Sequence, residues 1–186
     1  MLDLTKVKGK LPRGVTVRGS FFYIKTDFNY FILFSRLMKQ HAPVEAFDIM
    51  YKGAIPADRV AGVLAINSLF NAPNELPRKT GNESGEIVLD YDLDADLIYS
   101  AFMEQYGIDL FAKPLHFAKF RALLSGLHNT QLNDVIGYRL YKNTGKNDEF
   151  NKSRQQLRDA WRIIPENEEN DAENDEDLNY FENLLK

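Results

Sequence analysis

Acidic side chains at alternate positions of residues 90–96 have the spacing that comes closest to a cation site. The run Asp-Tyr-Asp-Leu-Asp-Ala-Asp resembles the start of a calcium-binding loop, which requires glycine at its sixth position and glutamate at its twelfth. These positions are Ala95 and Ala101 here. We therefore interpret Asp92 or Asp94 as the cap of a helix, where acids meet the positive end of the helix dipole.

The other residue types that carry chemistry also lack the necessary spacing. No two of His41, His116 and His128 are four apart, as two ligands on one helix face would be. The chain has no cysteine, which excludes disulfides, thiolate metal sites and a cysteine nucleophile. Gly145-Lys146 has no glycine five residues before it, and no G-x-S-x-G occurs. The sequence predicts no enzyme, with no catalytic residue, no metal site and no cofactor.

One helix pair around Gly126 is a candidate helix-turn-helix for nucleic-acid binding. Arg121 and Ser125 fall where that motif takes apolar residues, and the second helix has one strong base, Arg139, before Lys142. A helix that reads DNA needs donors to base edges and a basic face for phosphates. We favour an ordinary packed helix pair and keep nucleic-acid binding as a minor alternative.

Charge divides the chain unevenly. Residues 166–186 hold nine acids and one base, a charge of −8, whereas residues 1–165 hold 22 bases and 18 acids, a charge of +4. The acidic segment has too few apolar residues to fold alone, so we predict a largely disordered tail that shields the chain or contacts a partner. Its end, residues 178–185, places apolar residues where a short docking helix would need them.

No segment predicts export or membrane insertion. The first ten residues alternate apolar and basic positions without the apolar core of a signal peptide. The longest apolar run, residues 30–34, is far shorter than the roughly 20 residues of a membrane span. We expect no membrane contact and a cytoplasmic location in the cell that makes the protein.

The spacing of apolar residues predicts a mainly α fold. Residues 1–165 are expected to form a single helical domain of six to seven helices with an N-terminal β-hairpin at 14–24 and a mobile loop at 71–86. The helices are expected at about 27–41, 43–52, 56–70, 92–106, 114–127, 131–142 and 149–164.

Local signals predict how several of these helices begin and pack. Pro56 and Pro114 are expected in first turns, and Thr130 is expected as a cap. The helix at 114–127 is apolar nearly all round and is expected to be central. The last helix is expected to have one apolar face, made of Phe150, Leu157, Trp161 and Ile164.

Three stretches together have a specific pattern. They are Thr26-Asp27-Phe28; Tyr91-Asp92-Leu93-Asp94-Ala95-Asp96-Leu97-Ile98-Tyr99 with Phe102 and Tyr106-Gly107-Ile108-Asp109-Leu110; and residues 115–127 leading to Ile136-Gly137-Tyr138-Arg139. Over residues 11–142 the chain resembles the bacteriophage gene-product-fifteen family, found in tail-gene modules of long-tailed phages and prophages of Gram-positive bacteria. That family has paired tryptophans where this chain has Phe117-Ala118.

The resemblance implies a gene between those of the tail-tube and tape-measure proteins. In many tailed phages, proteins from that position are tail-assembly chaperones that coat the tape-measure protein until tube subunits replace them. We therefore expect a chaperone in the host cytoplasm that binds the tape-measure protein and other tail proteins, and a homo-oligomer is compatible with this role. A structural tail component is the main alternative. The residues that we predict to contact a partner are Phe117, Arg121, Arg139, Trp161, Tyr180 and Phe181.

Overall fold

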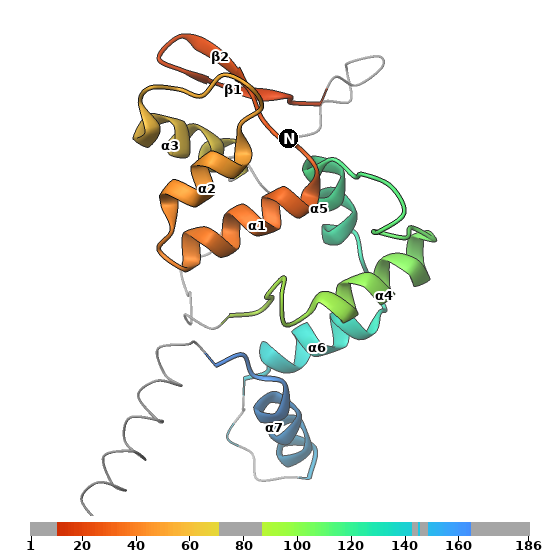
Figure 1. The fold of residues 1–186 in the computed structure, drawn as a ribbon. Helices are drawn as coiled ribbons and strands as arrows, with labels where there is room; N and C mark the ends of the chain where they lie inside the picture. Colours follow the sequence, from red (N-terminus) through yellow and green to blue (C-terminus); the bar gives the residue numbers. More distant parts are fainter. Residues whose placement is uncertain (1–10, 71–86, 143–144, 146–148, 165–186) are drawn as a thin grey trace, which may run out of the picture. The chain divides into compact units, whose positions relative to one another are not determined.

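The computed structural model describes residues 11–70, 87–142, 145 and 149–164. These residues contain seven helices and one two-stranded antiparallel sheet, which confirms the predicted fold class (Figure 1). The contacts divide the chain into two compact units. Unit 1 is Met1–Thr80 with Tyr99–Leu127, and unit 2 is Gly81–Ile98 with His128–Lys186. The predicted loop at 71–86 and the predicted acidic tail lie outside the described residues.

The predicted hairpin is present in unit 1 and packs on a helix. Strands β1 (Gly14–Val17) and β2 (Ser20–Tyr23) pair antiparallel around a two-residue turn. Arg18 and Gly19 in this turn both have left-handed backbones, with φ of 49° and 83°. Two such residues match the twist of a tight hairpin, and glycine adopts this conformation without steric cost. β1 lies against helix α3 (Figure 1), so the marginal two-stranded sheet is supported by helix packing.

Three helices follow the hairpin in unit 1: α1 (Phe28–Lys39), α2 (Pro43–Met50) and α3 (Arg59–Phe70). The predicted start of α3 at Pro56 is wrong. The Asp58 carboxylate accepts a hydrogen bond from the Ala61 N–H at 2.9 Å, so an acidic cap begins the helix.

Phenylalanine rings form the core of unit 1. The Phe70 ring lies edge-on to Phe31 and Phe117, with centroid distances of 4.8 Å in both cases, and 5.5 Å from Phe34. All four side chains are buried. Such edge-on pairs add specific attraction to the burial of apolar area, and they connect α1, α3 and α5.

A glycine lets α2 and α3 approach closely. A Cβ atom at Gly62 would lie 2.5 Å from the edge of the Phe47 ring and 3.0 Å from the Tyr51 hydroxyl. That hydroxyl donates to the Gly62 carbonyl at 3.1 Å. Any side chain at this position would therefore disturb the buried contact between the two helices.

Helices α4 (Ala95–Tyr106) and α5 (Phe117–Ser125) pack in unit 1 through stacked rings of Phe102 and Phe120, 5.3 Å apart. The predicted end of α4 at Gly107 is confirmed. Its φ is 62°, and the Ile108 N–H returns to the Phe102 carbonyl at 3.2 Å, which closes the last turn.

The helix predicted at 114–127 differs in its start and in its burial. It begins at Phe117 rather than at Pro114, because the Nδ1 atom of His116 accepts the Ala118 N–H and caps the first turn. Its predicted central position is wrong. Ala122 is exposed, and within α5 the buried side chains all lie in the first half of the helix.

In unit 2, α6 (Gln131–Arg139) begins as predicted at Thr130, whose N–H donates to the Asn133 side chain. The last helix is α7 (Glu149–Trp161), and the apolar face predicted for it is partly covered, because Leu157 and Trp161 are half-buried. Phe150 is 63% exposed, and the buried side chain of α7 is Asn151, which accepts a hydrogen bond from the Tyr141 hydroxyl. A polar hydrogen bond between Tyr141 and Asn151 therefore contributes to the packing of α7.

A buried ion pair joins three segments of unit 2. The Arg139 guanidinium donates to both carboxylate oxygens of Asp94 at 2.7 and 2.8 Å. It also donates to the carbonyls of Val88 at 3.0 Å and Trp161 at 2.7 Å. The Asp94 carboxylate accepts the Asp90 N–H as well. Asp94 lies directly before α4, where the sequence predicted a capping residue. Its carboxylate accepts hydrogen bonds from Arg139.

Candidate functional site

A short antiparallel bridge brings together two segments that are far apart in the sequence. The Phe28 N–H donates to the Leu115 carbonyl at 2.9 Å, and the Phe117 N–H donates to the Thr26 carbonyl at 2.8 Å. Both helices that follow, α1 and α5, therefore start from one fixed point in unit 1.

His116 holds this point to the N-terminal segment. Its Nδ1 accepts the Ala118 N–H at 3.1 Å, so the proton lies on Nε2, which donates to the Pro12 carbonyl at 2.8 Å. Burial lowers the pKa of His116 below its ordinary value, against opposing effects of the Pro12 hydrogen bond and the Asp27 charge. The neutral ring is the form that can make both contacts.

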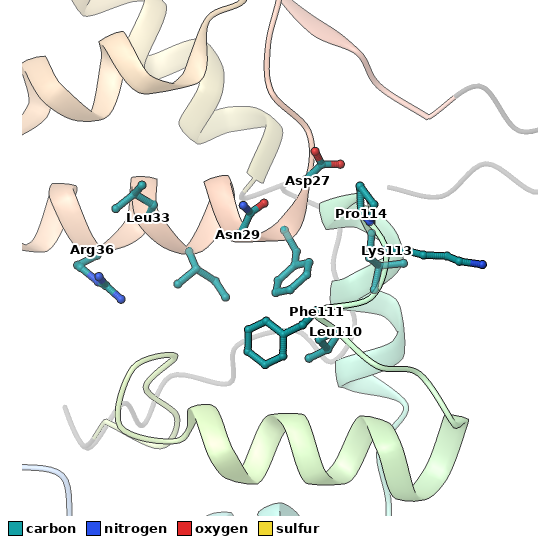
Figure 2. A pocket seen from close by; sticks show the side chains of 11 residues that line it. Asp27, Asn29, Leu33, Arg36, Leu110, Phe111, Lys113 and Pro114 are labelled. Carbon is teal, nitrogen blue, oxygen red and sulfur yellow. The ribbon is translucent and has the colours of Figure 1, made fainter.

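Beside this bridge lies an apolar groove of about 560 Å³ (Figure 2). One wall is the start of α1 and the other is the segment 110–115 that precedes α5. The groove is lined by Asp27, Phe28, Asn29, Ile32, Leu33, Arg36, Leu110, Phe111, Lys113, Pro114 and Leu115. Every lining residue belongs to unit 1.

The groove contains the most exposed aromatic side chain reported for the described residues. Phe111 is 87% exposed, and its ring contacts Tyr99 at a centroid distance of 5.4 Å. Figure 2 shows the Phe111 ring in the space beneath α1. The adjacent Leu110 is buried and anchors the segment. An exposed large apolar side chain within an apolar hollow is typical of a binding surface.

The lining of the groove is mostly apolar. Its ionisable side chains are Asp27, Arg36 and Lys113, and Figure 2 shows Arg36 and Asp27 at opposite ends of the α1 wall. No group of three histidine, aspartate or glutamate side chains that could hold a metal occurs in the described part of the chain. The groove is thus an apolar surface with charges at its rim.

Comparison with known proteins decides the family. The family model for Bacteriophage Gp15 protein matches residues 63–164, which is more than half of the chain. The chain belongs to this family. No curated protein and no solved structure matches it.

The residues matched by the Gp15 family model include some parts of the fold and leave out others. Helices α4 to α7 and the groove wall at 110–115 lie inside the matched residues, whereas the α1 wall and the Thr26-Asp27-Phe28 stretch precede them. Within the described residues, no helix is both long enough and apolar enough to cross a membrane.

Two residues predicted to contact a partner lie in unit 1 of this Gp15 family member. Phe117 is 1% exposed and belongs to the phenylalanine core. Arg121 is half-buried and donates to the Phe70 carbonyl, where it caps the end of α3. Both side chains make contacts within the chain, and partner binding at Phe117 and Arg121 stays a prediction.

The other predicted partner residues lie in unit 2. Arg139 is buried in the pair with Asp94, so the second helix of the proposed helix-turn-helix cannot offer it to DNA in this conformation. Trp161 is half-buried at the end of α7, and partner binding there stays a prediction. Tyr180 and Phe181 lie outside the described residues.

Sequence reasoning did not identify the groove. Its walls come from residues 27–36 and 110–115, and apolar spacing within one helix says nothing about which distant segment lies opposite. A usable signal was nevertheless present. Phe111 is a large aromatic residue in a short connection between two predicted helices, with no helical stripe to bury it.

Proposed function

We propose that this chain is a tail-assembly chaperone that binds the tape-measure protein in the host cytoplasm while the phage tail forms. Family membership supports a role in a bacteriophage. The gene position implied by the resemblance supports tail assembly. The observation that carries a binding role is the apolar groove in which Phe111 is 87% exposed.

The dimensions of the groove fit a client that must later be released. A hollow of about 560 Å³ receives a few side chains rather than a whole domain. Several shallow contacts of this kind hold a long client at many points, and each can be replaced when tube subunits arrive. A deep, closed site would instead favour tight binding of one ligand.

Co-expression tests this function directly. The tape-measure protein is expressed alone, with the wild-type chain, and with two variants, and its soluble fraction and co-purification are measured. We expect the wild type to keep it soluble and Phe111→Ala to lose most of this effect. Phe150→Ala, which removes an aromatic ring 63% exposed in unit 2, is the matched control and should behave as wild type. A tape-measure protein that stays insoluble with the wild-type chain would refute the proposal.

Mass spectrometry of purified virions separates the chaperone from a structural tail component. A chaperone is absent from finished particles, whereas a structural component is present in amounts comparable to other tail proteins. A regulator would instead bind DNA in a salt-sensitive way. We expect no shift in a gel titration at low salt, because the predicted recognition helix uses Arg139 inside unit 2.

A further inference from the structure

The groove of unit 1 has the length of two helical turns. Phe28, Ile32 and Arg36 recur every four residues along the α1 wall. At a rise of about 1.5 Å per residue, this stretch is about 12 Å long. Two or three apolar side chains from one face of a partner segment would fill it.

The backbone around the groove indicates how such a partner would bind. An extended segment that adds to a sheet edge needs a row of unpaired N–H and C=O groups. The Phe28 N–H and the Leu115 carbonyl are already bonded to each other, the Phe111 N–H donates to the Asp109 carboxylate, and Pro114 has no N–H. Side-chain contacts must therefore dominate, which is the mode of an amphipathic helix lying in a groove.

The charged residues at the rim of the groove determine which charges are favoured beside the apolar face of the partner helix. Among the lining residues, Arg36 and Lys113 outnumber Asp27. Lys39 lies with Arg36 in the last turn of α1. A partner with carboxylates beside its apolar face is favoured by this potential, and one with ammonium groups is disfavoured.

We infer that the groove between α1 and residues 110–115 binds an amphipathic helix of the client, with apolar residues at i, i+4 and i+7 and acidic residues beside them. Phe111 is the anchor of this contact, and Arg36 sets its preference for acidic flanks. The inference rests on the proposed function and names the chemistry of the segment that the chaperone would hold.

Two synthetic helices test this inference with the full-length chain. Both are 15-residue fluorescein-labelled peptides with leucines at i, i+4 and i+7; one has glutamates on its other face and its twin has lysines. Fluorescence anisotropy at low salt measures their affinities. We expect the wild-type chain to bind the glutamate peptide and to bind the lysine twin at least about threefold more weakly, the size of a rim-charge effect.

Variants assign the contact to the groove. Phe111→Ala should weaken glutamate-peptide binding by about 10- to 30-fold, as the loss of a central aromatic anchor does. Arg36→Glu should reduce or reverse the preference between the two peptides. Phe150→Ala should bind as wild type. Circular dichroism should be unchanged in Phe111→Ala, because this side chain is 87% exposed and its ring contact is with the half-buried Tyr99.

Three results of the peptide titrations would overturn the inference: binding of neither peptide, equal or tighter binding of the lysine twin, or wild-type affinity in Phe111→Ala. Co-expression keeps this inference separate from the proposed function. If Phe111→Ala loses the peptide but still keeps the tape-measure protein soluble, the groove is not the client site and the chaperone role stands. If the wild type binds the peptide but leaves the tape-measure protein insoluble, the chaperone role fails instead.

Discussion

Replacing Arg139 should lower the free energy of unfolding of unit 2 far more than replacing any exposed basic residue. The side chains of Arg139 and Asp94 are 6% and 2% exposed, so solvent screens their attraction little. Arg139→Met would leave the Asp94 carboxylate buried without its counter-charge. The Asp90 N–H would still donate a hydrogen bond to this carboxylate. Breaking a buried pair in this way costs about 3–5 kcal/mol, which is a large part of the roughly 5–15 kcal/mol that stabilises a typical domain.

A double-mutant cycle isolates the pair from the rest of the site. Asp94→Asn alone should also be costly, because it leaves the guanidinium buried without its counter-charge. The combined variant Asp94→Asn/Arg139→Met removes both charges and should lose less stability than the two single losses added together. The coupling expected for residues in direct contact is about 0.5–3 kcal/mol, and a pair with two hydrogen bonds belongs at the upper end.

The chain supplies its own probe for this measurement. Trp161 is the single tryptophan, and its carbonyl accepts a hydrogen bond from Arg139. Urea unfolding followed by tryptophan fluorescence therefore reports on unit 2. Arg154→Met is the matched control. This side chain is half-buried over the rings of Tyr138 and Phe150, and its loss should cost less than about 1 kcal/mol. A loss below about 1 kcal/mol in Arg139→Met, or strict additivity in the cycle, would refute the reasoning.

Three further predictions concern glycine packing and two titrating side chains of unit 1. Gly62→Ala should lower the melting temperature because its Cβ would lie 2.5 Å from Phe47, whereas Gly137→Ala in unit 2, where the added Cβ meets no atom within 4 Å outside its own helix backbone, should raise stability by up to about 1 kcal/mol. Burial raises the pKa of Tyr51 to about 12, so the stability from this neutral hydroxyl is complete below pH 10 and is lost as the pH rises through 12. Absorbance titration at 295 nm should show one late tyrosine that is missing in Tyr51→Phe. Burial lowers the pKa of His116, so its contribution is complete above about pH 6.5 and is lost as the pH falls through the lowered value. Urea midpoints at pH 7.5 and 5.5 should differ less in His116→Asn than in the wild type.

The spacing of apolar residues predicted the positions of the helices. The first residue of a helix depended instead on which side chain caps its first turn. Proline is favoured at the first helical position, and this preference placed two helix starts at Pro56 and Pro114. In the structure, Asp58 and His116 each accept a hydrogen bond from a first-turn N–H, and the helices begin there. A side chain that satisfies an otherwise unpaired donor stabilises a helix start more than a fixed φ angle does.

The polar interior of unit 2 was beyond sequence reasoning for a different reason. The run of acids at 90–96 predicted helix capping, and Arg139 was treated as a base available to a partner. Both assignments considered each residue with its near neighbours. The ion pair joins Arg139 and Asp94, which are 45 positions apart in the sequence. The amino-acid sequence alone does not distinguish a buried arginine from an exposed one. The same limit hid the burial of Asn151 in α7.

The groove lies beside a backbone bridge between two stretches that carry the family resemblance. The stretches that carry the family resemblance include Thr26-Asp27-Phe28 and residues 115–127, and the structure joins their ends through two backbone hydrogen bonds. This bridge fixes the start of α1 beside the segment that holds Phe111, so the groove follows from the same contact that organises unit 1. The partner that we propose would meet a surface that is already formed, with the Phe111 ring 87% exposed, and this would lower the entropy cost of binding.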